Sequence, residues 1–235
     1  MSNDAQHNQT CLLEVIACTV EDAVEAELGG ANRLEIISRF DVGGLTPPID
    51  LVREIKAKVS LPLRVILRES EGYGVSGEAE IKKLCAAARE LNATGVDGIV
   101  LGFLQKGTVN FDLIEKILFC APNLKATFHH AFEDATDKFF AIEKLKGLAQ
   151  IDRILAHGGQ GIWAEKISRL EDYANAAQPE IKILAGGGID SQVISMIRAK
   201  TSIREFHVGS ATRANGKVEM SRVTTLARAL RENYD

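Results

Sequence analysis

The stretch CLLEVIACTVEDAVEAELGGANRLEII, residues 11–37, contains one complete strand–helix–strand unit. Its two ends, 11–17 and 33–37, are short aliphatic runs that are typical of strands buried on both faces. Between them, the segment 20–30 places apolar residues at helical spacing and ends in a pair of glycines. The unit therefore predicts two parallel strands joined by a helix.

The same alternation continues along the rest of the chain. Eight strands are predicted, at 11–17, 33–37, 63–67, 97–101, 124–129, 152–156, 181–185 and 204–208. Eight helices follow them, at 20–30, 49–59, 78–95, 110–120, 138–149, 162–177, 190–200 and 220–233. This number of units in a chain of 235 residues predicts the α/β class and a single-domain (β/α)8 TIM barrel over residues 11–235.

A doubly wound open sheet is the alternative fold. Such a sheet normally carries a glycine-rich nucleotide fingerprint after its first strand, whereas this chain continues there with ACTVEDA.

The composition is that of an ordinary globular protein. A net charge of −4 argues against a nucleic-acid partner, and no apolar run is long enough to cross a membrane. The first ten residues, MSNDAQHNQT, are polar and lack the features of a signal peptide, so we expect a disordered tail. The four cysteines show no CxxC spacing, which predicts reduced thiols and a cytoplasmic location.

Two glutamates interrupt the first two predicted strands. Glu14 and Glu35 stand inside apolar runs, where an ionised carboxylate is costly unless it is paired, hydrated or bound to a ligand. Neighbouring strands lie about 4.8 Å apart, so two inward carboxylates would repel each other and favour one shared proton. Arg33 precedes Glu35 by two residues and is expected on the same face.

More polar residues follow the ends of other predicted strands. They are Arg68 after the third, His129, His130 and Glu133 after the fifth, His157 after the sixth and His207 at the end of the eighth. Because functional residues of a barrel gather at the carboxyl ends of its strands, we expect one shared mouth. Each residue also has an ordinary interpretation: a buried histidine can be a hydrogen-bonded core residue, and Glu35 can simply pair with Arg33 or Arg68.

Two glycine-rich turns predict an anion site. ILAGGGID (183–190) contains Gly186, Gly187 and Gly188, and FHVGSATR (206–213) contains Ser210. Backbone amides in such turns bind anions, and barrels often bind phosphate in the loops after strands seven and eight. The alternative is a tight turn capped by Asp190 or Ser191.

Two further loops belong to the predicted mouth. DVGGLTPPID (41–50) presents Thr46, and HGGQG (157–161) is a weaker copy of the glycine-rich turn. RESEGYGVSGE (68–78) carries Tyr73 and is a candidate mobile lid.

Six motifs resemble one known family. LLEV, GANRLEI, GGLTPP, TFHHAFE, AGGGI and EFHVGSA occur in the order and spacing of the CutC family, barrels linked to copper homeostasis. The resemblance implies a cytoplasmic barrel, a homodimer and a role in copper binding or traffic. The matching positions are Glu14, Arg33, Glu35, Gly43, Gly44, Thr46, His129, Phe132, Gly187 and His207.

The chain departs from this family where copper chemistry would need soft ligands. Cysteines common in the family are Ile16 and Ile37 here, and isoleucine cannot replace a thiolate that binds Cu(I). His130 replaces a usual arginine, Glu133 a usual aspartate and His157 a usual serine. Copper is therefore a cofactor suggested by the resemblance alone, and the residues identify no metal ligands.

Three functions remain open from the sequence. The first is copper homeostasis, with Cu(I) bound by Cys18 or by histidines. The second is a lyase, isomerase or hydrolase acting on a small anionic or sugar-like substrate. The third is a Zn²⁺ or Mn²⁺ site of glutamates and histidines, although no HxH strand motif is present.

The enzyme hypothesis assigns roles to residues of the predicted mouth. Glu14 and Glu35, with Arg33 beside them, would transfer protons, and His129 and His207 would orient or polarise the substrate. The remaining residues would bind the ligand or its anionic group: Thr46, Arg68, His130, Glu133, His157, Gly186, Gly187, Gly188 and Ser210.

Overall fold

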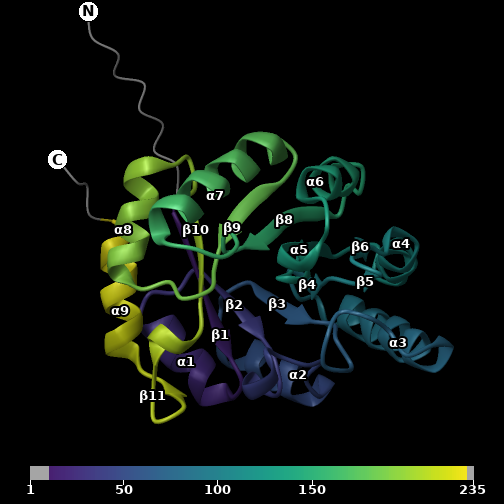
Figure 1. Ribbon diagram of the computed structural model, residues 1–235. Helices are drawn as coiled ribbons and strands as arrows, with labels where there is room; N and C mark the ends of the chain where they lie inside the picture. Colours follow the sequence, from purple (N-terminus) through teal and green to yellow (C-terminus); the bar gives the residue numbers. More distant parts are fainter. Residues whose placement is uncertain (1–10, 232–235) are drawn as a thin grey trace, which may run out of the picture.

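The computed structural model describes residues 11–231 and confirms the (β/α)8 TIM barrel (Figure 1). The predicted tail at 1–10 lies outside the described residues. Eight parallel strands close the barrel in the order β1-β2-β3-β4-β7-β8-β9-β10, and β10 pairs with β1. They are β1 (Leu12–Ala17), β2 (Arg33–Ile36), β3 (Leu63–Ile66), β4 (Gly98–Leu101), β7 (Lys125–Phe128), β8 (Ile151–Ala156), β9 (Lys182–Ala185) and β10 (Glu205–Val208).

Helices surround the barrel, and each of the eight main ones lies within a predicted range. They are α1 (Val20–Leu28), α2 (Ile49–Lys58), α3 (Glu78–Thr94), α4 (Phe111–Cys120), α6 (Lys138–Lys146), α7 (Trp163–Ala177), α8 (Ser191–Lys200) and α9 (Met220–Ala229). Side-chain caps fix several starts, and Asp190 caps α8 by accepting the Val193 N–H at 2.9 Å. Within residues 11–231, no helix has the length and apolar character needed to span a membrane.

Several short elements have no counterpart in the predicted set. They are α5 (Ala131–Asp134), the 3₁₀ helices η1 (Phe40–Val42) and η2 (Ser210–Thr212), and the hairpins β5 (Leu104–Gln105) with β6 (Thr108–Val109) and β11 (Arg213–Ala214) with β12 (Lys217–Val218). They are too short for hydrophobic periodicity to reveal. Asn215–Gly216, which joins β11 to β12 with both φ angles positive, is nevertheless a known hairpin signal.

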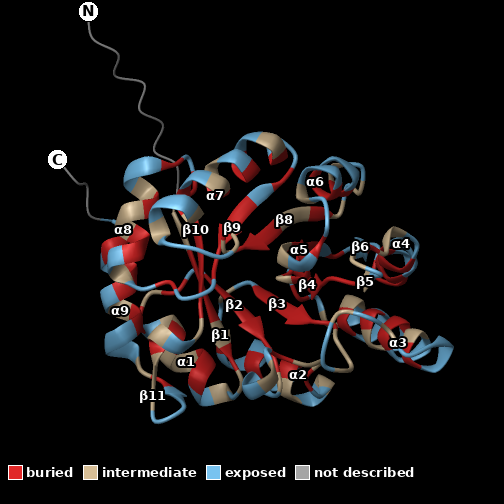
Figure 2. Ribbon diagram, viewed as in Figure 1, coloured by how far each residue is buried: buried red, intermediate tan, exposed pale blue. Residues whose placement is uncertain are grey.

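Side chains of the barrel strands point either outward, into the apolar core, or inward, toward the barrel axis. On β1, Leu13, Val15 and Ala17 are fully buried and belong to the large apolar core (Figure 2). The intervening Glu14 and Ile16 face the barrel axis, because successive side chains of a strand point to opposite sides. A second apolar cluster, here called the apolar ring, consists of Ile37, Ile66 and Val100 with Ile16 and Cys18 against it.

The lower part of the barrel interior is ionic rather than apolar. Arg64 on β3 is 1% exposed, and its guanidinium donates to Asp97 at 2.9 Å and to both oxygens of Asp152 at 2.7 and 2.8 Å. Thr127 accepts a further hydrogen bond at 3.1 Å. A Cβ at position 98 would lie 3.0 Å from Arg64 Nε and 2.4 Å from a backbone oxygen, so glycine is required there.

We predict that Arg64→Met lowers the free energy of unfolding by about 3 kcal/mol, because it leaves Asp97 and Asp152 without their common cation. Partial exposure of these two carboxylates, 38% and 24%, limits the loss. Urea denaturation at neutral pH measures the effect. Arg64→Lys keeps the charge but loses the paired hydrogen bonds, so its free energy of unfolding should lie between those of the parent and of Arg64→Met. An Arg64→Met variant as stable as the parent would contradict an ionic role for Arg64.

Candidate active site

A pocket of about 300 Å³ opens at the carboxyl ends of the barrel strands. This size suits a small molecule. Its walls bring together eight of the predicted site residues: Glu35, Arg68, His129, His130, Gly187, Gly188, His207 and Ser210. The expectation of one shared mouth is therefore met for these residues.

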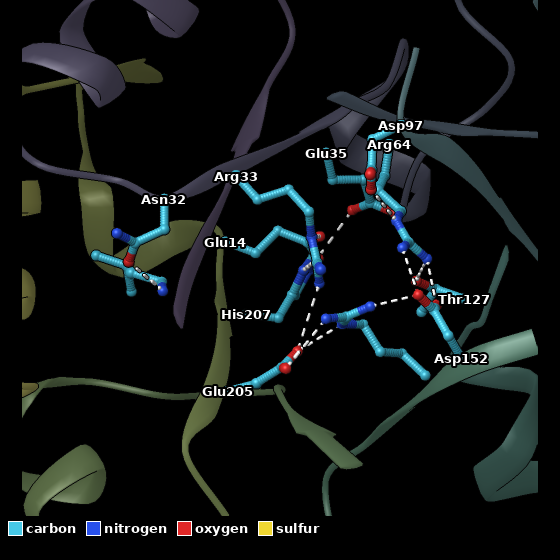
Figure 3. Close-up of polar contacts among 12 residues, drawn as sticks. Glu14, Asn32, Arg33, Glu35, Arg64, Asp97, Thr127, Asp152, Glu205 and His207 are labelled. Carbon is cyan, nitrogen blue, oxygen red and sulfur yellow. Dashed lines mark hydrogen bonds and ion pairs between the residues drawn. The ribbon is translucent and has the colours of Figure 1, made fainter. Parts of the chain in front are cut away.

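Glu14 and Arg33 lie deeper in the barrel and do not line this pocket. Glu14 is 1% exposed and Arg33 is 2% exposed. Arg33 Nε donates to Glu14 Oε2, and the other oxygen of Glu14 lies 2.8 Å from His207 Nδ1. Figure 3 shows the side chains of Glu14, Arg33 and His207 close together.

His207 lies between the glutamates of the first two strands, Glu14 and Glu35. Its Nδ1 contacts Glu14, and its Nε2 lies 3.6 Å from Glu35 Oε2. The expectation of a proton shared directly by Glu14 and Glu35 is thus replaced by a relay of carboxylate, imidazole and carboxylate. Glu35 and His207 reach the pocket, whereas Glu14 does not.

This relay ends a longer series of alternating acids and bases, here called the charge chain. Neighbouring members are linked by hydrogen bonds or by ion pairs of no more than 3.9 Å. From the lower end of the barrel to the pocket it runs Asp97, Arg64, Asp152, Arg153, Glu205, Arg33, Glu14, His207 and Glu35.

The charge chain separates the pKa values of its two upper glutamates. Burial alone would raise the pKa of Glu14, but Arg33 and His207 outweigh it and hold that pKa well below its usual range. Burial and the nearby Glu14 charge raise the pKa of Glu35 to about 7, against the opposing effects of His207 and Arg33. Burial would lower the pKa of His207, but the carboxylates of Glu35 and Glu14 raise it. Two chemically identical groups therefore hold their protons differently near neutral pH.

Two other histidines of the pocket stay neutral. Burial lowers the pKa of His129 to about 3, and the charge of Arg68 adds to the effect. Burial also lowers the pKa of His130 to about 3, together with three neighbouring imidazoles. His129 Nδ1 accepts the Ala131 N–H at 3.1 Å, so the neutral ring carries its hydrogen on Nε2. That Nε2 is buried and has no hydrogen-bond partner among the described residues.

Arg68 is held in the pocket wall by the backbone. Its Nε donates to the Gly72 carbonyl at 3.0 Å, and its Nη1 donates to the Val42 and Gly44 carbonyls at 3.1 Å. Thr46 does not line the pocket but bonds both the N–H and the carbonyl of Arg68. No carboxylate within residues 11–231 forms an ion pair with Arg68, so its charge is available to a ligand.

Three more predicted residues support the loops around the pocket without lining it. Glu133 Oε1 accepts the backbone N–H groups of His157 at 2.6 Å and Gly158 at 2.9 Å. The Gly186 N–H donates to the Ala156 carbonyl at 2.9 Å, which continues the sheet. Their position favours a role in loop structure.

The predicted lid loop contributes one aromatic wall. Tyr73 lines the pocket, with its ring centroid 5.2 Å from that of His129 and 5.5 Å from Arg68 Cζ. Glu80 ties the loop by accepting hydrogen bonds from Ser70 and Ser76. The mobility of the loop stays a prediction.

The donor set does not fit a Cu(I) site built on paired thiolates. Ile16 and Ile37 line the pocket where such thiolates would stand. The pKa of Cys18 is raised, mainly by burial, so its sulfur stays protonated, and it lies 3.7 Å from an Arg213 nitrogen. Within the described part of the chain, no group of three or more histidine, cysteine, aspartate or glutamate residues is arranged to hold a metal ion.

Sequence reasoning missed the lower members of the charge chain. They are Arg64, Asp97, Asp152, Arg153 and Glu205. The signal was nevertheless present, because Arg64, Arg153 and Glu205 interrupt apolar strands as Glu14 and Glu35 do. Glu205 also precedes His207 by two residues, as Arg33 precedes Glu35.

Comparison with known proteins gives a consistent match. The model of the CutC family matches residues 11–212. A human protein named copper homeostasis protein cutC homolog is 31% identical over 207 residues, which cover 87% of this chain and 76% of the human one. A family protein CutC of Parabacteroides distasonis is 31% identical over 210 residues, covering 88% of this chain and 86% of that protein.

Solved structures agree with these matches. The crystal structure of a putative copper homeostasis protein CutC from Streptococcus agalactiae has a TM-score of 0.78 and 25% identity, covering 86% of this chain and 99% of that one. Phosphoribosyl anthranilate isomerase from Thermococcus kodakaraensis has a TM-score of 0.66 at 12% identity, covering 95% and 100% of the two chains, and shares the fold alone.

We predict opposite stability effects for the two upper glutamates. The folded state keeps a proton on Glu35 up to about pH 7, whereas the unfolded chain loses it near 4.5, so the free energy of unfolding falls as pH rises through this window. At pH 8, Glu35→Gln should therefore raise the free energy of unfolding by up to about 3 kcal/mol. Glu14→Gln should lower it by about 3–5 kcal/mol, because Arg33 and His207 lose their anion.

Denaturant unfolding of both variants between pH 4.5 and 8 measures these changes. Glu54→Gln, at an exposed position of α2, is the matched control and should change neither the stability nor its pH dependence. Equal destabilisation by both variants at pH 8 would contradict the separation of their pKa values.

Proposed function

The chain belongs to the CutC family, and we propose that its pocket performs acid–base catalysis on a small anionic or sugar-like molecule. The observation that carries this proposal is the position of Glu35, a carboxyl group with a pKa of about 7 in the floor of a small-molecule pocket. A general acid or base works best when its pKa lies near the operating pH. A lyase, isomerase or hydrolase would use such a group.

Glu35 is the proton-transfer group in this proposal. Its ionised form takes a proton from the substrate, and the electron pair of the broken bond remains on the substrate. The neutral acid then returns the proton to the same or a neighbouring substrate atom. His207 positions Glu35 and, through its own raised pKa, stabilises the carboxylate before the transfer.

Glu14 supports this step from below without touching the substrate. It binds His207 at 2.8 Å and is itself neutralised by Arg33, so the imidazole is held in one orientation. Glu14 and Arg33 are therefore positioning residues.

His129 and Arg68 supply the electrophilic side of the pocket. The unpaired Nε2–H of His129 is suited to donate to a substrate oxygen on which negative charge develops. The guanidinium of Arg68 favours an anionic ligand.

Copper homeostasis is the second candidate function. It is the role printed in the names of the human and mouse relatives, which are 31% and 32% identical to this chain. Any copper would have to bind here without the thiolates that Ile16 and Ile37 replace. Cys18, beside the apolar ring, and the pocket histidines are the remaining soft or borderline donors.

We also propose a cytoplasmic location and a homodimer, both from the family resemblance. Cys18, Cys85 and Cys120 are free thiols, which is usual in a reducing compartment and supports the first of these proposals.

We predict that the protein catalyses hydrogen–deuterium exchange into a substrate from a panel of small phosphorylated, carboxylated and hydroxylated compounds, followed by NMR in D₂O. The rate should rise as pH passes through about 7, where Glu35 loses its proton. Glu35→Gln should reduce the rate by at least about 100-fold. Glu54→Gln should leave it unchanged, and exchange that survives Glu35→Gln would exclude Glu35 as the base.

We predict weak Cu(I) binding, because the pocket lacks its thiolate pair. Titration against a competing Cu(I) chelator should show an affinity no higher than that of an unrelated barrel with four thiols. Introducing Ile16→Cys and Ile37→Cys together should strengthen binding by at least about 100-fold, since thiolates are the preferred Cu(I) ligands. Tight binding by the parent protein that Cys18→Ser abolishes would favour the copper function instead.

A further inference from the structure

We infer that the substrate is a phosphate monoester, and that its phosphate group binds the backbone of the loops after β9 and β10. This inference rests on the proposed function of the same pocket, and it adds the substrate class.

Two loops that line the pocket carry backbone N–H groups without an acceptor in the described chain. In the β9 loop, the N–H groups of Gly187, Gly188 and Ile189 have no acceptor within the described part of the chain. In the β10 loop, the same holds for Gly209 and Ser210. All five residues line the pocket. We infer that their N–H groups form one donor surface, here called the amide cradle.

The space in front of the cradle is open. A Cβ at Gly188 would meet no atom within 4 Å, and Gly187 and Gly188 both have a φ of +78°, which favours glycine. Asp190, which follows the β9 loop, has an oxygen engaged by the Val193 N–H of α8. The loop therefore lets a ligand approach its backbone closely.

A second, independent feature points to a ligand in this pocket. His129 is 5% exposed, and its Nε2 has no partner within residues 11–231. A buried N–H without an acceptor is costly, unless a ligand supplies one. Arg68 follows β3, across the barrel from β9, and lines the same pocket with a positive charge that no carboxylate of the described chain pairs.

A phosphate group fits these donors better than a carboxylate. Five N–H groups exceed what the two oxygens of a carboxylate can accept in good geometry, whereas a phosphate monoester presents three terminal oxygens and up to two negative charges. Positive charge on Arg68 and His207 favours the more highly charged ligand.

A phosphate bound at the amide cradle also places the rest of the substrate near Glu35, the proposed proton-transfer group. Gly209 follows His207 by two residues, so a phosphate at the cradle lies at the upper rim of the same strand. The organic part of the ester then extends downward to Glu35, and an oxygen on it can accept from His129. The ester bond is not broken in this arrangement.

The test uses inorganic phosphate as the probe and the full chain as the protein. Phosphate should shift the ¹⁵N–¹H resonances of Gly187, Gly188 and Ser210 and bind with a Kd of about millimolar strength. Ser210 is exposed, so Ser210→Asp and Ser210→Asn should both fold. Ser210→Asp should weaken phosphate binding by at least about tenfold through like-charge repulsion, whereas Ser210→Asn, of nearly equal size, should change it less than about threefold.

The outcomes separate this inference from the proposed function. Phosphate that shifts none of these amides, or that binds Ser210→Asp as tightly as the parent, would overturn the cradle. Glu35→Gln should bind phosphate normally while it loses proton exchange. Exchange found only with unphosphorylated compounds would overturn the substrate class and leave the acid–base function intact. Phosphate binding at these amides without exchange into any compound would overturn the acid–base function and leave the phosphate site intact.

Discussion

Charge balance among buried side chains inside the barrel is the constraint on which the rest of this structure depends. Barrel interiors are usually filled by branched apolar side chains, yet here a charge chain crosses the lower half. Below Glu35, four carboxylates alternate with three guanidiniums and one imidazole, so the deeper charges cancel when His207 is protonated. Glu35 is the carboxylate left over. Burial and the nearby Glu14 charge raise its pKa, so the scaffold itself sets the protonation of the group proposed to react.

The apolar ring lies above the charge chain and adds to the burial of Glu35. Ile16, Ile37 and Ile66 line the pocket beside Glu35 and keep water from solvating its charge. A thiol at Ile16 or Ile37 would instead present a soft ligand. The aliphatic side chains at these two positions therefore fit the proposed proton transfer better than Cu(I) binding.

Sequence periodicity was sufficient to predict the barrel, because every buried strand and amphipathic helix leaves a local pattern. The gathering of Glu35, His129 and His207 at one mouth also followed from strand-end positions. The depth of each group in the barrel could not be predicted in this way, since Glu14 and Glu35 have the same local pattern but differ in access to the pocket. Pairings such as Arg64 with Asp152, which are 88 residues apart, depend on barrel closure and leave no local signal.

Glu14 and Glu35 differ in protonation because strand register gives them different neighbours. Glu14 pairs in register with both Arg33 on β2 and His207 on β10. Glu35 pairs in register with Ile16 on β1 and with Arg64 on β3, but the Arg64 guanidinium is engaged by Asp97 and Asp152 instead. Glu14 therefore receives two cations and stays ionised, and Glu35 receives one imidazole and an apolar neighbour. A one-residue slip of β1 would turn Glu14 toward the helices and place Leu13 and Val15 on the axis. The register that closes the barrel and the register that prepares the acid–base group are thus the same, so this site cannot be formed without the correctly closed fold.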